Sequence, residues 1–170
     1  SAVVNIGGTY GADGAAAVNP LVYALTVSNS VSGLSVTDGS LITLVKEGNV
    51  IVGRVASGAF AGQAAFAIAI DATSGVVTVE QYLSLDHPSN PNPDDMISLA
   101  LGSLGVTVAR TDGDGDRVTT AAVDISGQIR FDDDGPSLTI VTDLSVPNQI
   151  NTLLGNVGFA YGADGPGQIS

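Results

Sequence analysis

Short runs of β-branched and other apolar residues, each broken after a few positions by glycine, asparagine or aspartate, constrain this chain more than any other feature. Residues 41–55 contain two such runs around a glycine turn, and residues 64–82 repeat the pattern. In the second range, Phe66, Ile68 and Ile70 alternate with small residues, as in a strand with one buried face. Further runs lie at residues 21–28, 105–111, 117–126 and 137–142.

Turns at this spacing leave room for strands but not for long helices. The sequence therefore predicts an all-β fold, an antiparallel β-sandwich of Ig-like or Greek-key arrangement. Helical patterns are weak and confined to residues 94–102 and 148–155, so we expect at most one or two short helical turns.

The charge of the chain excludes several classes of partner. It carries 15 Asp and 2 Glu against 5 Lys and Arg, for a formal charge of −12. A nucleic-acid partner is not expected, because binding phosphates requires a basic face. Membrane insertion is not expected either, since no apolar run approaches the roughly 20 residues of a membrane span. The start of the sequence lacks the basic region of a signal peptide, which suggests an intracellular protein, export by another route, or a piece of a longer chain.

The stretch TDGDGD, residues 111–116, raises the question of a metal. One Asp-Gly would make a hairpin turn, whereas three aspartates with only glycine between them repel each other. The glycines allow the backbone to curl, so that Asp112, Asp114 and Asp116 can converge on one calcium ion with oxygens at about 2.4 Å. A solvated turn is the alternative. The spacing does not match an EF-hand, because Arg117 and Val123 stand where that loop needs Gly and Glu.

A second acidic stretch, FDDDGP, occupies residues 131–136. Asp132, Asp133 and Asp134 alternate in direction, so they cannot easily serve one local site, but they could bind calcium across a domain junction. Asp13 and Asp164, each in a Gly-Ala-Asp-Gly turn, are candidate partners at that junction. A solvated linker is the simpler interpretation of such a charge run.

The motif TYGADG at residues 9–14 returns as AYGADG at residues 160–165, which is 151 positions later. A motif that recurs at domain-length spacing indicates a tandem repeat. We therefore expect residues 1–136 to form one β-sandwich repeat that ends in an acidic linker. Residues 137–170 would begin the next repeat and pack on the first.

The only histidine, His87, lies in a loop rich in proline and asparagine at residues 85–96. We expect an exposed loop here, with Asp94 or Asp95 capping a short turn. Nothing in the sequence has the pattern of a hydrolase nucleophile, so we expect no enzymatic activity. An alternative function is a binding module that contacts a surface or glycan through this loop.

Three motifs in this order are similar to a known family: YGADG, GVVTVEQYLSLDHPSNPNPDD and ARTDGDGDRVTTAAVDISGQIRFDDDGP. Together they resemble the tandem repeat domains of giant type I-secreted RTX adhesins, over about residues 9–165. These are long bacterial surface proteins that serve attachment and biofilm formation.

The resemblance implies an extracellular, calcium-stabilised extender domain that spaces a distal adhesive region from the cell. Its partners would be neighbouring repeats of the same chain, with a surface ligand for the parent protein. It also implies secretion without an N-terminal signal peptide. Carried onto this sequence, it makes Asp112, Asp114 and Asp116 expected calcium ligands. The acids of residues 132–134 and of the two Gly-Ala-Asp-Gly turns would lie at a junction.

Overall fold

The computed structural model describes residues 1–87, 95–132, 137–139 and 158–160, and the larger of its two main sheets is a five-stranded antiparallel layer. Its strands follow each other in chain order, β2-β3-β4-β5-β6. Their bounds are Val31–Ser35, Leu41–Glu47, Val50–Val55, Ala64–Ile70 and Val77–Gln81. Each strand pairs with the next along the chain, as expected for a meander built from hairpins.

The second layer is built around β8 (Leu104–Thr111), which pairs antiparallel with β1 (Leu21–Val27). The register runs without interruption from Leu21 opposite Arg110 to Val27 opposite Leu104. On its other edge, β8 pairs with β9 (Arg117–Thr119) and β10 (Val123–Asp124). The range 117–126, which the sequence predicts as one strand, is therefore divided into two.

Two short ladders complete the described structure. β7 (Met96–Ser98) pairs with β11 (Arg130–Asp132), and β12 (Ser137–Thr139) pairs with β13 (Gly158–Ala160). The single helical turn in the described residues is a 3-10 turn, η1 (Ser126–Gln128). The expected turn at residues 94–102 is a prediction that the structure corrects, because Met96–Ser98 is extended and uses its backbone to pair with β11. Residues 148–155 lie outside the described part of the chain.

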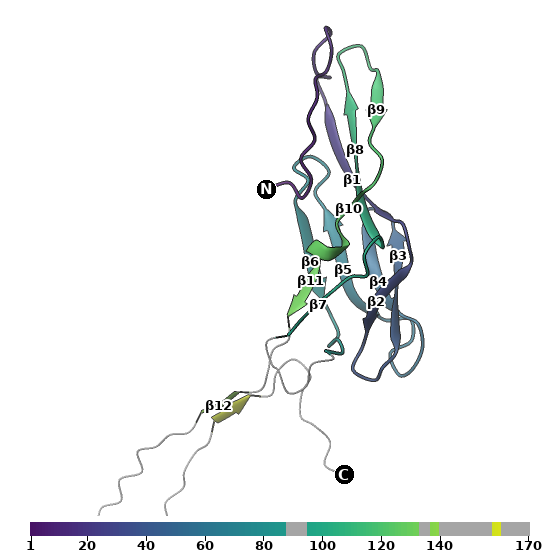
Figure 1. The fold of residues 1–170 in the computed structure, drawn as a ribbon, viewed down its shortest axis with the longest axis vertical. Helices are drawn as coiled ribbons and strands as arrows, with labels where there is room; N and C mark the ends of the chain where they lie inside the picture. The colour runs from purple at the N-terminus through teal and green to yellow at the C-terminus, as the bar shows by residue number, and fades with distance from the viewer. Residues whose placement is uncertain (88–94, 133–136, 140–157, 161–170) are drawn as a thin grey trace, which may run out of the picture.

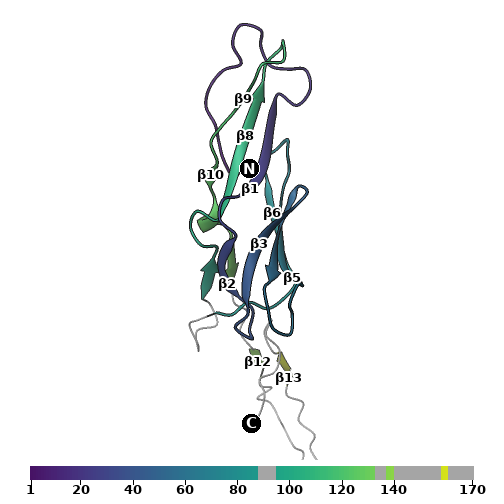
Figure 2. The same cartoon turned by 90° about the vertical axis from the view of Figure 1, so that its right-hand side faces the viewer.

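The two layers face each other, as Figures 1 and 2 show from directions 90° apart. β1 contacts β3, β4 and β5 across the interface. Phe66 is the largest fully buried side chain, and its ring centroid lies 4.9 Å from that of Phe131. Gly53 on the neighbouring strand leaves the room this ring needs, since a Cβ there would collide with it. The predicted antiparallel β-sandwich is thus confirmed.

The turns form where the sequence places them. β3 and β4 are joined by Gly48 and Asn49, with Glu47 opposite Val50. Gly48 takes a φ of +63°, a conformation that glycine adopts without strain. Between β5 and β6, the carboxylate of Asp71 accepts hydrogen bonds from the backbone N–H groups two and three residues further along. Such an Asx turn explains why aspartate begins this connection.

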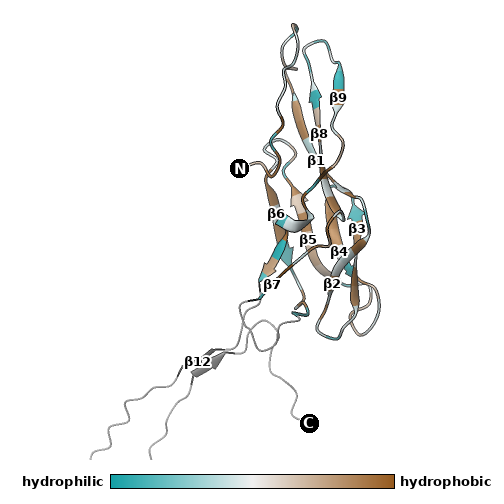
Figure 3. Ribbon diagram, in the orientation of Figure 1, coloured by the Kyte–Doolittle hydropathy of each residue, from teal (hydrophilic) through white to brown (hydrophobic). Residues whose placement is uncertain are grey.

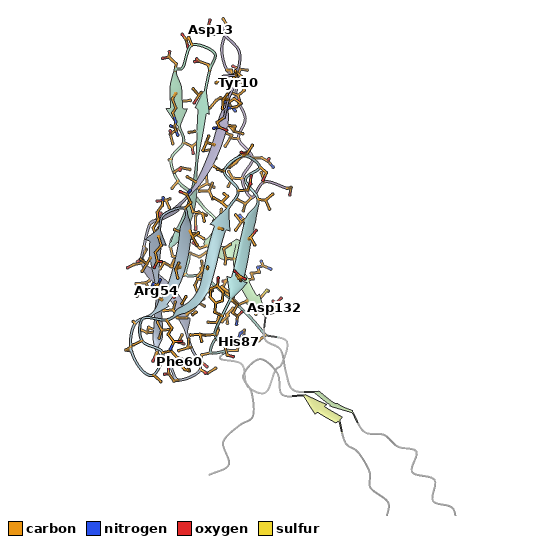
Figure 4. All side chains as sticks on the ribbon, turned by 180° about the vertical axis from the view of Figure 1, so that it is seen from behind. Tyr10, Asp13, Arg54, Phe60, His87 and Asp132 are labelled. Carbon is orange, nitrogen blue, oxygen red and sulfur yellow. The ribbon has the colours of Figure 1, made fainter. Side chains whose placement is uncertain are left out.

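The described sandwich is elongated, and its two ends differ in character. One end is the tip, which we define as residues 10–14 together with residues 111–116. Figure 4 shows Tyr10 and Asp13 at this end, and His87 and Asp132 near the opposite one. Hydrophobic residues concentrate on β1, β4 and β5, whereas much of β9, near the tip, is hydrophilic (Figure 3). None of the described segments is a helix long and apolar enough to cross a bilayer.

The tilted contact of the Phe131 ring with Phe66 joins β11 to the core of the sandwich, and this can be tested. Phe131 is buried, so Phe131→Ala should lower the free energy of unfolding by about 3–5 kcal/mol. For a chain of this size that corresponds to a fall in Tm of roughly 6–20 °C. The exposed Val118 offers a control, since Val118→Ala should change stability by less than about 0.5 kcal/mol. Equal Tm values for the two variants would show that β11 does not belong to the core.

Candidate metal centre

The tip is formed by two loops that are about a hundred positions apart in the sequence. One loop, residues 10–14, precedes β1, and the other, residues 111–116, follows β8. Because Leu21 lies opposite Arg110 in the antiparallel β1–β8 pair, both loops emerge at the same end of the sheet. Strand pairing therefore brings together two acidic turns that the sequence places far apart.

Backbone hydrogen bonds hold the two loops against each other. Ala15 and Asp112 form an isolated antiparallel bridge, and the N–H of Gly113 donates to the carbonyl of Gly14 at 3.0 Å. A Cβ at position 113 would collide with the backbone carbonyl of Asp13, so only glycine allows this approach. The glycines of TDGDGD thus have a packing role as well as a turn role.

Three carboxylates converge at this contact. One oxygen from each of Asp13, Asp112 and Asp114 lies within 4.8 Å of the others. Calcium binds oxygens at about 2.4 Å, so two ligands on opposite sides of one ion are about 4.8 Å apart. Asp13 and Asp114 are exposed and Asp112 is half-buried. The set is made of hard oxygen donors that are at least partly open to solvent, and the three oxygens are close enough together to hold one metal ion.

The structure places Asp116 differently from the prediction. It is not a member of this carboxylate group; instead its backbone N–H donates to Oδ1 of Asp112 at 2.8 Å. The N–H of Asp112 in turn donates to the carbonyl of Asp116 at 3.0 Å. Asp116 therefore closes the turn that presents Asp112 and Asp114.

The carboxylates of Asp112 and Asp114 perturb each other. A hydrogen bond with Asp114 raises the pKa of Asp112, with a further contribution from desolvation, whereas the same bond lowers the pKa of Asp114. Together, the two pKa shifts mean that a proton bound by this pair resides more readily on Asp112 than on Asp114. A pair of this kind is the expected result when like charges are held close without a cation.

The two arginines beside the loop do not neutralise these acids. The ion pairs within the described residues are Arg54–Glu47 and His87–Asp95, and neither involves the tip. Arg110 instead contacts an aromatic ring: its guanidinium lies 5.0 Å from the centre of the Tyr10 ring. It also donates hydrogen bonds to the carbonyls of Gly7 and Thr9. Arg110 thus fastens the N-terminal segment below the tip.

The remaining predicted ligands fall elsewhere. Asp132, the last residue of β11, is exposed and lies toward the end of the sandwich opposite Asp13, so these two acids of one unit do not share a site (Figure 4). Asp133, Asp134 and Asp164 lie outside the described residues. The sequence predicts that Asp13 and the acids of FDDDGP meet across a junction between two units, and a single unit does not test that prediction. Within one unit, the β1–β8 register carries residues 10–14 to the end opposite Asp132.

His87 differs from its prediction as an exposed loop residue. Its side chain is only 8% exposed, and its Nδ1 lies 3.1 Å from Oδ1 of Asp95, whose side chain is 11% exposed. This hydrogen bond connects the two residues that flank positions 88–94, and those positions lie outside the described residues.

Partial burial of the His87–Asp95 pair changes the expected cost of losing it. His87→Ala removes a part-buried ring and its hydrogen bond, and should lower the free energy of unfolding by about 1–3 kcal/mol. Tyr82, which is 52% exposed, is a nearby control, and Tyr82→Ala should cost less than about 0.5 kcal/mol. Chemical denaturation of both variants makes the comparison. If His87→Ala lowers the free energy of unfolding by less than Tyr82→Ala does, then His87 contributes no more to stability than an exposed loop residue.

Sequence comparison places the chain in a family without assigning it a role. A family model described as a domain of unknown function (DUF5801) matches residues 2–126. No curated protein matches the chain, and no solved structure does. The matched range covers both sheets, the tip and the candidate carboxylates, and it ends before β11 begins. Because the match spans well over half of the sequence, the chain belongs to the DUF5801 family of domains of unknown function.

Proposed function

We propose that this chain is a calcium-stabilised extender repeat of a large bacterial surface adhesin of the RTX type, secreted by the type I route. In this role it is a non-catalytic, extracellular spacer, and its partners are neighbouring repeats of the same chain. The observation that carries the proposal is the convergence of Asp13, Asp112 and Asp114, from two loops, to within 4.8 Å.

The position of the carboxylates supports a structural role for the ion. The tip lies apart from the main hydrophobic core, and it is held by backbone hydrogen bonds and by Arg110 rather than by buried side chains. Carboxylates that repel each other there weaken the end of the sandwich. A divalent cation would reverse the sign of that interaction and cross-link residues 10–14 to residues 111–116.

The elongated body supports a spacer. Asp13 and Asp132 lie toward opposite ends of the unit (Figure 4). In a head-to-tail array, the acids that follow β11 of one repeat would therefore approach the tip of the next. The acidic linker, the recurring YGADG motif and the ordered series of motifs shared with RTX adhesin repeats are consistent with such an array.

Calcium should raise the thermal stability of the chain. Extracellular modules bind calcium with Kd values of about 10⁻⁴ to 10⁻³ M, and a hundredfold excess over Kd adds roughly 2.7 kcal/mol per site. The expected rise in Tm is about 5–11 °C per site. Scanning calorimetry in EDTA and in excess calcium measures it, and superimposable curves would refute the proposal.

Two variants test whether the calcium-dependent rise in Tm comes from the tip. Asp114→Asn should lose most of the calcium-dependent rise while leaving the Tm in EDTA unchanged or slightly higher, because it removes a repelling charge. Glu80→Gln removes one exposed charge from β6, away from the tip, and should keep the full rise. A rise that survives in Asp114→Asn, or disappears in Glu80→Gln, would mean that calcium acts elsewhere.

Calcium affinity should also fall on acidification. The pKa of Asp112 is raised in the metal-free chain, so protons compete for this ligand at a higher pH than for an ordinary aspartate. The group is ionised, and fully available to calcium, only above its raised folded pKa. Calorimetric titrations from pH 7 down to the ordinary aspartate pKa of 3.8 should show a rising Kd, and Asp112→Asn should weaken binding and flatten that dependence. A Kd independent of pH across this range would exclude Asp112 as a ligand.

A further inference from the structure

β6 (Val77–Gln81) forms one edge of the five-stranded sheet. Among the described residues it pairs with β5 on one side only, and its last four residues are exposed. The other edge of this sheet is covered, because the N–H groups of Asp86 and Ala100 donate to carbonyls of β2. Within the described part of the chain, β6 is therefore the open edge of the sheet.

The backbone of β6 presents alternate residues to this open side. At the two ends of the β5–β6 ladder, the N–H of Tyr82 donates to the carbonyl of Ala65, and the N–H of Asp71 donates to the carbonyl of Val76. Because antiparallel pairs alternate between bonded and non-bonded, even-numbered residues of β6 bond to β5 and odd-numbered ones face away from it. Among the described residues, the backbone groups that face away have no hydrogen-bond partner. The residues concerned are Val77, Val79 and Gln81.

This free stretch has a defined beginning and end. Before it, the N–H of Val3 donates to the carbonyl of Gly75, so the N-terminal segment covers the edge there. After it, the chain bends at Leu83. A second strand can therefore pair with residues 77–81 and no further. An exposed, extended edge of this kind is a template for strand addition.

Exposed apolar side chains flank the edge symmetrically. Val76, Val79 and Tyr82 are 39%, 37% and 52% exposed. Val79 is the middle residue of β6, and the other two lie three positions before and after it. A two-fold axis through Val79 would therefore place Tyr82 of each copy beside Val76 of the other. Such self-complementarity is what a contact between two identical surfaces requires.

We propose that β6 is a self-association edge, which pairs antiparallel with β6 of a second copy of this chain about a two-fold axis at Val79. In this register the open-side residues form three hydrogen-bonded pairs. Val79 pairs with Val79 of the second copy, and Val77 of each copy pairs with Gln81 of the other. All the backbone groups that β6 leaves free are then bonded.

The neighbouring registers are less favourable. An axis at Glu80 would place two carboxylates directly opposite each other, which destabilises a strand pair. An axis at Thr78 would bring Gln81 opposite Gly75, whose carbonyl is already bonded to Val3. It would leave only two hydrogen-bonded pairs. Charge and hydrogen bonding thus both favour the axis at Val79.

The direction of β6 fixes how the two copies would lie. β6 runs roughly along the long axis of the sandwich (Figures 1 and 2). A two-fold axis across the strand reverses its direction, so the two sandwiches would lie side by side with their tips at opposite ends. One five-residue strand from each copy makes a smaller contact than a standard protein interface, so the association is weak and reversible. The charge of −12 on each copy opposes it at low salt.

Disulfide trapping tests the register directly, because the chain contains no cysteine. Only the residue on the axis faces its own equivalent, at a Cα distance of about 5.5 Å, which suits a disulfide. Val79→Cys in the full chain should therefore form a linked dimer under mild oxidation. Gln81→Cys is the matched exposed control, since the two copies of position 81 would be about 13 Å apart along the strands. Thr78→Cys reports the alternative axis.

Val79→Cys should cross-link at least about ten times faster than either of the other two variants. Equal rates for all three would indicate random collision, and a fastest rate for Thr78→Cys would indicate another register. Either result would overturn the proposed edge.

Sedimentation equilibrium at high salt, from a few micromolar to about 1 mM chain, tests the association without cysteine. Val79→Pro removes an N–H that bonds nothing in the single chain, so the fold should be kept, as circular dichroism can show. Association should weaken at least about tenfold, because both N–H groups on the axis are lost. Val79→Ala keeps the N–H and should weaken association less. Equal weakening, or an association that Val79→Pro leaves intact, would place the contact elsewhere.

Both measurements are made in EDTA, which separates them from the calcium proposal. β6 belongs to the five-stranded sheet, whereas the loops of the tip flank β1 and β8 of the other sheet. Selective cross-linking without a calcium effect on Tm would keep the self-association edge and refute the metal centre. A calcium-dependent Tm without selective cross-linking would refute the edge and keep the metal centre.

Discussion

The antiparallel pairing of β1 with β8 is the interaction on which the rest of the structure depends. It joins residues 21–27 to residues 104–111, and it is the central ladder of the second layer. Its inward side chains, among them Leu25 and Val106, are fully buried against the five-stranded sheet. Its far end carries both loops of the tip. One register therefore sets the core packing and the position of the candidate metal ligands, because in a sheet a shift of one residue would move every side chain to the opposite face.

The tip shows a conflict between backbone geometry and charge. The glycines of residues 111–116 and the bridge between Ala15 and Asp112 force two acidic turns together. The raised pKa of Asp112 is a consequence of holding these carboxylates close together. A fold that only needed a turn here would be more stable with fewer aspartates. A cation in the proposed site would remove this conflict.

The two ends of the unit are stabilised in different ways. Toward β7 and β11 the sandwich is closed by the tilted ring contact of Phe66 with Phe131 and by the part-buried His87–Asp95 pair. At the tip, buried apolar side chains give way to hydrogen bonds, the Arg110–Tyr10 contact and the carboxylates. A module that meets its neighbours through polar ends can have junctions that respond to calcium while its core stays folded. This difference gives the proposed extender a physical basis.

The sequence by itself determined the fold class, most strands and the turns between them. Alternating apolar residues and Asp-Gly or Gly-Asn punctuation act locally, so residues 41–55 and 64–82 formed the hairpins expected of them. It also singled out Asp112 and Asp114 as candidate ligands, because their spacing is local. The hydrogen bond from the Asp116 backbone and the partial burial of His87 are local, but they depend on how each loop closes, which residue type alone does not fix. Only the tertiary structure decided that Asp13 lies beside Asp112 and Asp114. The physical reason is that this approach depends on the pairing of β1 with β8 across roughly ninety residues, and a single sequence carries no direct record of such long-range pairing.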